Sequence, residues 1–325
     1  MIWLQFITCG ALLTFFAYHL SKEGIILSEK THLEEGVIGM VFLAIATSFP
    51  EIVTSATAVF SFDRVALGYG DLIGSVIVNF MVLTFLDIYI GRGRILLRVD
   101  RSNRLTGDLI LAAAIILLAA FALRTYGPGV PSIGGVGLES VLLVIMYASY
   151  LFVIHRKGPA THESLYRDEK SSFLSLWAKF ISLLLVVMGL GMWMARIGDR
   201  IVAMTELSQN FTGTLLLGFA TSLPEIIVSF AALKAGSADM AVGNILGSNL
   251  FDICIVPLLD LLTDTPLMSG ITPGGITATA IVLALSVIAV MGMKIKKDAG
   301  RRLSWDTALI FAIGLTGFVI LYYIN

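Results

Sequence analysis

The chain has 325 residues, of which 57% are hydrophobic and only 14% are charged, and its formal net charge is −1. Soluble globular proteins carry about 25% charged residues, and in water the apolar surface of this chain could not be buried. The composition therefore excludes a soluble enzyme, a nucleic-acid-binding protein and a secreted disulfide scaffold. It predicts a polytopic membrane protein, in which Cys9 and Cys254, both in apolar segments, are interpreted as packing residues.

Ten apolar segments are predicted to cross the bilayer. About 20 apolar residues span it as a helix, and continuous rather than alternating apolar runs favour helices over a barrel. In chain order the segments are residues 2–20, 36–61, 65–89, 106–123, 136–154, 173–195, 210–233, 238–262, 273–293 and 305–323. The first has no basic leader region and is interpreted as a retained span. The expected fold class is all-α, with ten transmembrane helices.

The positive charges are distributed unequally between the loops. Numbered in chain order, the odd loops carry seventeen Lys and Arg residues and the even loops carry four. Because cytoplasmic loops are enriched in Lys and Arg, the odd loops are predicted to be cytoplasmic and both termini extracytoplasmic. The expected location is the cell membrane, with the lipid bilayer as surroundings and neither a nucleic acid nor an obligate protein as partner.

The chain is predicted to consist of two related halves. A polar connector, residues 155–172, separates a first five-helix repeat, residues 1–154, from a second, residues 173–325. The segment ATSFPEIVTS at 46–55 matches ATSLPEIIVS at 220–229 in seven of ten positions, and GDLIGS at 70–75 matches GNILGS at 243–248. With five spans in each half, the second repeat enters the membrane from the opposite side. Inverted repeats with interrupted helices are typical of secondary transporters, whose sites lie at the bilayer midplane where the repeats meet.

Three carboxylates, Glu51, Glu225 and Asp252, are predicted to lie deep in the membrane. Each costs about 2.5–3.5 kcal/mol at the centre of a membrane helix. No Lys or Arg lies at a comparable depth in the same spans. A bound cation is therefore the predicted partner, and protonated carboxyl groups that form only hydrogen bonds are the alternative.

Further oxygen atoms are predicted to surround these carboxylates. Each glutamate has a serine three residues earlier on the same side of its helix, and the third span of each half carries two polar residues four apart. Pro50 and Pro224 each leave a backbone carbonyl without its helical donor. The hydroxyl and amide candidates are Thr47, Ser48, Thr221, Ser222, Ser75, Ser248 and Asn79. Such a set of oxygens, without imidazole or thiolate, suits hard cations such as Ca²⁺ or Na⁺.

Four other aspartates are interpreted less sharply. Asp87, Asp260 and Asp264 lie near the ends of spans and are expected to be solvated there. Asp71 lies early in the third span, at the position that Asn244 occupies in the second half. It is interpreted either as a helix cap or as a fourth carboxylate near the ion path.

The paired blocks resemble the α-repeats of the Ca²⁺/cation antiporter superfamily, and in particular those of its prokaryotic sodium/calcium exchangers. The resemblance implies a four-helix core made of the second, third, seventh and eighth spans, over which the first and sixth spans slide. It implies ion sites lined by Glu51, Glu225, Asp252 and Asn79, with hydroxyl ligands from Thr47, Ser48, Thr221, Ser222, Ser75 and Ser248. The carbonyls of Ala44 and Gly218 match the backbone ligands of the family. Asp71 departs from the family pattern, which has asparagine there.

These observations predict a secondary active antiporter that exports Ca²⁺ in exchange for Na⁺ by alternating access. No cofactor is expected beyond the transported Ca²⁺ and Na⁺. The nearest alternative is a Ca²⁺/H⁺ antiporter on the same fold, because protons can also neutralise clustered carboxylates. A cation channel would pass Ca²⁺ without a counter-ion. An enzyme is not expected, because no nucleophile–base pair and no HExxH motif lies within the spans.

Overall fold

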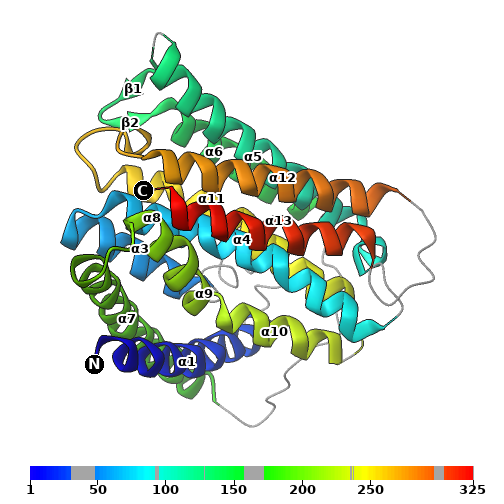
Figure 1. The fold of residues 1–325 in the computed structure, drawn as a ribbon. Coiled ribbons are helices and arrows are strands. Elements are labelled where there is room, and N and C mark those ends of the chain that lie inside the picture. Colours follow the sequence, from blue (N-terminus) through cyan, green and yellow to red (C-terminus); the bar gives the residue numbers. More distant parts are fainter. Residues whose placement is uncertain are drawn as a thin grey trace.

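The computed structural model describes residues 1–30, 48–91, 95–127, 129–156, 172–234, 236, 238–295 and 304–324. Nearly all of these residues are helical (Figure 1). The α-helices are α1 (Ile2–Lys30), α3 (Phe49–Phe62), α4 (Val65–Ile90), α5 (Arg101–Tyr126), α6 (Leu138–Arg156), α7 (Phe173–Met204), α8 (Gln209–Phe211), α9 (Gly218–Thr221), α10 (Leu223–Lys234), α11 (Ala238–Asp260), α12 (Pro273–Lys294) and α13 (Trp305–Tyr323). Shorter elements are η2 (Ile95–Arg98), η3 (Thr212–Leu217) and η4 (Leu267–Ser269), and a two-stranded antiparallel hairpin of β1 (Ser132–Ile133) and β2 (Val136–Gly137).

The described helices identify a polytopic membrane protein, as the composition predicts. Seven of them are long and apolar enough to cross a bilayer, and a bent pair, residues 209–221 with 223–234, can form an eighth span. The shorter apolar helices α3 and α6 lie within predicted segments 36–61 and 136–154 or extend just beyond them. Residues 36–47 of the second predicted segment lie outside the described residues. Both chain ends lie at the same end of the helical bundle (Figure 1).

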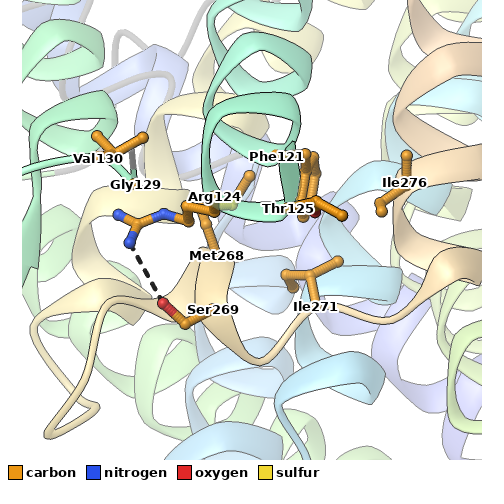
Figure 2. A pocket seen from close by; sticks show the side chains of 9 residues that line it. All are labelled: Phe121, Arg124, Thr125, Gly129, Val130, Met268, Ser269, Ile271 and Ile276. Atoms are coloured by element: carbon orange, nitrogen blue, oxygen red, sulfur yellow. Dashed lines mark hydrogen bonds between the residues drawn. The ribbon is translucent and has the colours of Figure 1, made fainter. Parts of the chain in front are cut away.

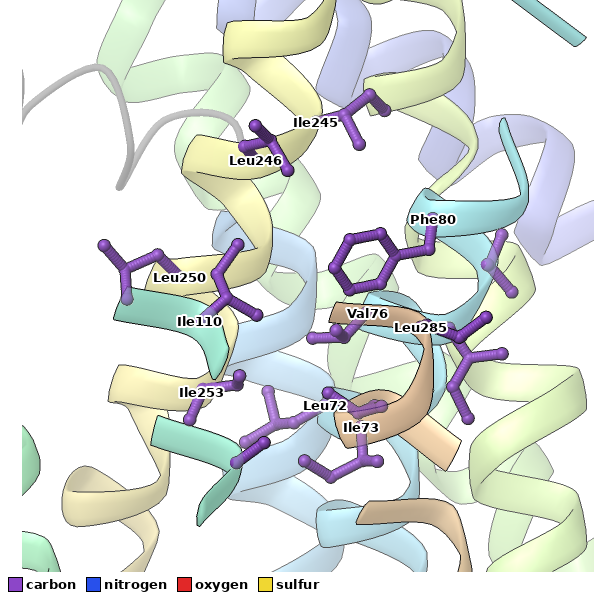
Figure 3. Packing of buried hydrophobic residues seen from close by; sticks show 14 of the residues in the cluster. Leu72, Ile73, Val76, Phe80, Ile110, Ile245, Leu246, Leu250, Ile253 and Leu285 are labelled. Atoms are coloured by element: carbon purple, nitrogen blue, oxygen red, sulfur yellow. The ribbon is translucent and has the colours of Figure 1, made fainter. Parts of the chain in front are cut away.

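Helices α4 and α11 form the centre of the molecule. In each, 72% of the most apolar stretch is buried inside the protein, against 17% for α7. They pack on each other, and α5, α12 and α13 surround them. Figure 3 shows side chains from α4, α5, α11 and α12 meeting in this core, among them Leu72, Phe80, Ile110, Leu250 and Leu285. Because apolar residues cover nearly every side of α4 and α11, these helices read as continuous apolar runs rather than as amphipathic ones.

Helices α1 and α7 form a separate layer on one side of this core. They contact each other, and α7 also packs along α3 (Figure 1). Their shared apolar cluster includes Leu13, Leu20, Val187 and Met194. With 29 and 32 residues, they are the longest helices that the structure describes.

The seventh predicted span is broken. It begins as α8, continues as the π-helix η3 and then α9, and bends by 42° before α10. The break lies at Ser222, and Pro224 is the second residue of the helix that follows. A proline fits the first turn of a helix, where its missing N–H has no partner to lose. The same arrangement occurs in the first half, where Ser48 precedes α3 and Pro50 is its second residue.

Two buried carboxylates connect the halves of the chain. Asp87, near the end of α4, accepts hydrogen bonds from the backbone N–H groups of Ile95 (2.8 Å) and Ser304 (3.0 Å) and from the hydroxyl of Thr307 (2.9 Å). Asp260, at the end of α11, accepts hydrogen bonds from the backbone N–H groups of Gly137 and Leu267. Each aspartate thus binds the loop after its own helix and the region where the fifth span of the opposite half begins.

The expectation that these two aspartates are solvated is therefore wrong. Both side chains are completely buried, whereas Asp264 is exposed as expected. The loops that follow α4 and α11 fold back over the carboxylates, because their backbone N–H groups need acceptors.

Candidate functional site

Glu51 and Glu225 occupy equivalent places in the two halves. Each is the third residue of its helix, Glu51 in α3 and Glu225 in α10. Both side chains are 1% exposed. The unsatisfied backbone N–H groups of a first helical turn carry partial positive charge, so both carboxylates lie where a negative charge is favoured.

Helices α4 and α11 bring two further carboxylates, Asp71 and Asp252, within electrostatic range of Glu51. Glu51 is within electrostatic range of Glu225, Asp252 and Asp71, and the hydroxyl of Ser48 lies close to the carboxylate of Asp252. Glu225 also interacts with Asp252. Among the described residues, no three His, Cys, Asp or Glu side chains have the spacing of a metal cluster made of these types alone. The carboxylates therefore interact electrostatically without forming such a cluster among the described residues.

Many polar atoms in this region are buried and have no hydrogen-bond partner among the described residues. They include one carboxylate oxygen each of Glu51 and Asp252, both carboxylate oxygens of Glu225, both amide atoms of Asn79 and the hydroxyl of Ser222. A buried polar group without a partner costs about 1–3 kcal/mol, and a charged one costs more. So many acceptor oxygens in one place fit a cation better than they fit each other.

A second group of oxygens surrounds Thr221 on α9. The hydroxyl of Ser75 lies 3.2 Å from the hydroxyl of Thr221 and 3.3 Å from the carbonyl oxygen of Gly218. The hydroxyl of Thr221 also lies 3.0 Å from the carbonyl oxygen of Leu217. The structure thus brings together three residues that the sequence predicts as ligands from different halves of the chain.

The remaining predicted ligands are placed unequally. Ser248 lies on α11, 4% exposed and one helical turn before Asp252. Thr47 and Ala44 lie outside the described residues.

Asp71 is not a helix cap. It lies inside α4, completely buried, and its carboxylate accepts hydrogen bonds from the hydroxyls of Ser55 (2.8 Å) and Thr221 (3.2 Å) rather than from backbone N–H groups. Because Asp71 interacts electrostatically with Glu51 and Asp252, it is a fourth carboxylate of this region.

One residue of this region was missed by the sequence interpretation. Asn249 is completely buried, and neither of its amide atoms has a hydrogen-bond partner among the described residues. It follows Ser248 and precedes Asp252 by three positions on α11, where the first half has Val76. The signal was present in the sequence, since a polar residue stood at the end of a repeated block inside an apolar span.

The ion pairs that the structure describes lie elsewhere. Arg124 binds the buried carboxylate of Glu139 at 2.7 Å, and Arg64 binds Asp199 at 2.8 Å. Arg124 also donates to Ser269 at the mouth of a surface pocket between α5 and the loop around η4, with Phe121 and Ile276 on its walls (Figure 2). None of the predicted ligands lines this pocket.

The chain is similar to known proteins in both sequence and fold. A family model described as sodium/calcium exchanger protein matches residues 1–155 and 175–324. An uncharacterised membrane protein of Methanocaldococcus jannaschii is 30% identical over 219 residues, which are 67% of each chain. The solved structure of the sodium-calcium exchanger NCX_Mj, soaked with Na⁺ and Ca²⁺, is 25% identical, with a TM-score of 0.60 and 97% of both chains covered. The crystal structure of the H⁺/Ca²⁺ exchanger CAX shares the fold at 12% identity, with a TM-score of 0.73 over 99% of this chain and 86% of that one.

Proposed function

Because this chain belongs to the sodium/calcium exchanger protein family, we propose that it exports Ca²⁺ from the cell in exchange for Na⁺. It is a transporter family, and the buried oxygen-rich region is the place where this chain would bind the exchanged ions. The observation that carries the proposal is the set of unpartnered carboxylate, amide and hydroxyl oxygens between α3, α10, α4 and α11.

The chemistry of these residues fits hard cations. Ca²⁺ takes six to eight oxygen ligands, and Glu51 and Glu225, which come from opposite halves and interact electrostatically, would supply carboxylates. Asp252 and Asn79 add a carboxylate and an amide, and Thr47, Ser48, Ser222 and Ser248 add oxygens around them. Thr221, Ser75 and the carbonyl of Gly218 form a flanking place for Na⁺, which the carbonyl of Ala44 mirrors in the first half.

The architecture proposed for this function has ten spans in two inverted repeats, residues 1–154 and 173–325, joined by a cytoplasmic connector at 155–172. Seven long helices, one bent pair and the shorter helices α3 and α6 together supply ten candidates. Support for inversion comes from Asp87 and Asp260, which make equivalent contacts to the opposite half. Both termini are placed outside the cell by the charge of the loops, and both lie at one end of the bundle (Figure 1).

The ion exchanged for Ca²⁺ is either Na⁺ or H⁺, and each has support from a solved structure. Sequence identity of 25% to the sodium-calcium exchanger NCX_Mj supports Na⁺. The fold shared with the H⁺/Ca²⁺ exchanger CAX allows proton coupling as a second candidate. No resident cofactor is part of either mechanism, since the ions are the cargo.

The test is uptake of ⁴⁵Ca²⁺ into proteoliposomes. One set is loaded with Na⁺ and diluted into Na⁺-free buffer at equal pH, and a matched set carries only a pH gradient. The Glu225→Gln protein is measured beside the wild type in both sets, with its folding checked by gel filtration in detergent.

We expect uptake that requires the Na⁺ gradient and disappears in the Glu225→Gln protein. Uptake driven by the pH gradient alone would instead establish the proton-coupled exchanger. Uptake at the same rate with neither gradient would show a channel and overturn the proposal.

A further inference from the structure

Asp71 accepts a hydrogen bond where the equivalent residue of the second half donates one. Its counterpart, Asn244, donates its amide N–H to the hydroxyl of Ser229 at 2.9 Å and to the carbonyl oxygen of Glu225 at 3.3 Å. Asp71 does the reverse and accepts a hydrogen bond from Ser55 at 2.8 Å. The first half therefore has a carboxylate where the second half has an amide, at matched places beside matched serines.

The second oxygen of Asp71 reaches across to the other half. Its Oδ1 accepts the hydroxyl hydrogen of Thr221 at 3.2 Å, and the backbone carbonyl of Asp71 accepts that of Ser75 at 3.0 Å. Thr221 and Ser75 are two of the oxygens proposed above to hold Na⁺, and their hydroxyls lie 3.2 Å apart. One residue thus contacts both hydroxyls of that place, through its side chain and through its backbone.

Several acceptors compete for the single hydroxyl hydrogen of Thr221, and the acceptor that binds it decides which oxygens stay free. Thr221 has one hydroxyl hydrogen and four acceptors within reach, namely Asp71, the hydroxyl oxygen of Ser75 and the carbonyl oxygens of Leu217 and Gly218. A hydrogen bond to a carboxylate is about twice as strong as one to a neutral carbonyl. When the hydrogen of Thr221 points toward Asp71, the lone pairs of its oxygen and the carbonyl of Gly218 are left free for a cation.

The surroundings of Thr221 contain more acceptors than donors. The hydroxyl of Ser222 and both carboxylate oxygens of Glu225 are buried without a hydrogen-bond partner among the described residues. Asp71, Ser75 and Thr221 are all completely buried. Bulk water therefore does not reach these side chains to supply the missing hydrogens.

We propose that Asp71 is a positioning residue that sets the affinity of the Thr221, Ser75 and Gly218 oxygens for the monovalent coupling cation. It acts by holding the hydroxyl hydrogen of Thr221 away from the cation. This inference rests on the proposed Na⁺/Ca²⁺ exchange and assigns one step of it, Na⁺ binding, to a residue outside the ligand set.

The test uses proteoliposomes of phosphatidylethanolamine and phosphatidylglycerol with ⁴⁵Ca²⁺. Four proteins are compared: wild type, Asp71→Asn, Thr221→Val and the double variant. Two quantities are measured for each, the Na⁺ concentration that half-activates ⁴⁵Ca²⁺ efflux and the KM for Ca²⁺ in Ca²⁺/Ca²⁺ exchange without Na⁺. Gel filtration in detergent checks that each variant is folded.

We expect Asp71→Asn to raise the half-activating Na⁺ concentration about fivefold, the size of losing the charge from one charge-assisted hydrogen bond. The KM for Ca²⁺ should change less than the half-activating Na⁺ concentration, because Asp71 hydrogen-bonds directly to Thr221, whereas it interacts with Glu51 and Asp252 through its charge. In the Thr221→Val background the same substitution should have less than about half of that effect, since the contact through which it acts is gone.

Three results would overturn this inference. Equal shifts for Na⁺ and Ca²⁺ would show a general change in the site, and fully independent effects of the two substitutions would show that Asp71 does not act through Thr221. An unchanged Na⁺ dependence in Asp71→Asn would show no role at all. If the wild type itself exchanges Ca²⁺ without any Na⁺ dependence, the proposed function fails first, and the inference fails with it.

Discussion

A carboxylate in the first turn of a helix lies beside free backbone N–H groups, and Glu51 and Glu225 both occupy this place. The helix dipole contributes about 0.3–1 kcal/mol, and up to about 2 kcal/mol in partly buried positions. Each carboxylate costs about 2.5–3.5 kcal/mol in the membrane centre. The dipoles alone therefore do not offset the cost of Glu51, Glu225 and Asp252 together, and the difference is what a bound cation would provide.

The ligand residues around these glutamates could be predicted because their signal is local. A serine, a proline and a glutamate within four positions mark the start of a helix, and both halves show this. The surroundings of Asp87 could not be predicted in the same way. Its partners Ser304 and Thr307 lie more than 200 residues away, and hydropathy gives the depth of a residue but not the fold of distant loops.

Replacing Asp87 with alanine should lower the stability of the protein. The substitution leaves the N–H groups of Ile95 and Ser304 and the hydroxyl of Thr307 without their acceptor. Each buried unsatisfied donor costs about 1–3 kcal/mol. Thermal unfolding in detergent, followed by gel filtration of the fluorescently tagged protein, should show a clearly lower midpoint for Asp87→Ala.

Asp264→Ala is the matched control, because Asp264 is an exposed aspartate near the end of the eighth predicted span. Its midpoint should stay close to that of the wild type. Equal midpoints for the two variants would mean that the buried contacts of Asp87 do not hold the halves together.

At the scale of elements, the broken seventh span and α4 approach each other through backbone atoms. A Cβ atom at Gly74 would collide with the carbonyl oxygen of Thr214 in η3, and one at Gly218 would lie 2.7 Å from the backbone carbon of Gly74. Only glycine allows this approach, which brings Ser75 next to Thr221 and the carbonyl of Gly218. The π-helical geometry of η3 shifts the register of its carbonyls at the same place. Hydropathy predicted this segment as one span because it is apolar throughout, and it did not reveal the π-helix.

Gly74→Ala should therefore abolish Na⁺-driven ⁴⁵Ca²⁺ uptake and lower the unfolding midpoint. The added methyl group meets backbone atoms, which cannot rotate away, and overpacking of this kind costs about 1–3 kcal/mol or more. Gly189→Ala is the control within a long helix, since a Cβ atom there has nothing within 4 Å. Transport by Gly74→Ala at the rate of Gly189→Ala would show that the close approach is not needed.

The layer of α1 and α7 is tied to the core by one ion pair that the structure describes outside the apolar contacts. Arg64, at the start of α4, binds Asp199 of α7, and the two side chains are 34% and 25% exposed. If this layer moves relative to the core during exchange, as the family resemblance leads us to expect, the ion pair forms in only some of its positions. An ion pair that forms in one arrangement and not in another shifts the balance between them.

Arg64→Gln and Asp199→Asn should each change the apparent KM for Ca²⁺ by about two- to fivefold, the effect of a partly exposed ion pair worth up to about 1 kcal/mol. The exchanged pair Arg64→Asp with Asp199→Arg should restore most of the wild-type value. Measurements in low and high concentrations of choline chloride should show a smaller difference at high salt. An exchanged pair that behaves no better than the single variants would contradict a latch at this place.

At the scale of the whole molecule, the two halves contribute equivalent parts to one centre. Each supplies a helix with a glutamate in its first turn, a buried central helix and an aspartate that binds the other half. The long apolar helices and their order follow from apolar length, because the bilayer sets a fixed distance to cross. The small hairpin at 132–137, whose turn is formed by Gly134 and Gly135 with positive φ, has no such constraint and was not predicted. The same is true of the packing of α1 and α7 against α3.

The charge of this centre also predicts that exchange is obligatory. Switching access from one side of the membrane to the other closes the centre to water on both sides for a time. With its carboxylates ionised and no cation, that closed state would carry their full cost, about 2.5–3.5 kcal/mol for each. With Ca²⁺ or Na⁺ bound, that cost falls because the opposite charge lies beside them. The empty protein should therefore switch access far more slowly than the loaded one.

Proteoliposomes loaded with ⁴⁵Ca²⁺ should accordingly retain it in choline chloride with a chelator, and release it when Na⁺ is added outside. Unlabelled Ca²⁺ added outside in place of Na⁺ should also release the label, because the protein can switch access with either Ca²⁺ or Na⁺ bound. A calcium ionophore added at the end measures the total trapped label. Release into choline chloride as fast as into Na⁺ would mean that the empty protein switches access freely. The carboxylates would then not be what makes exchange obligatory.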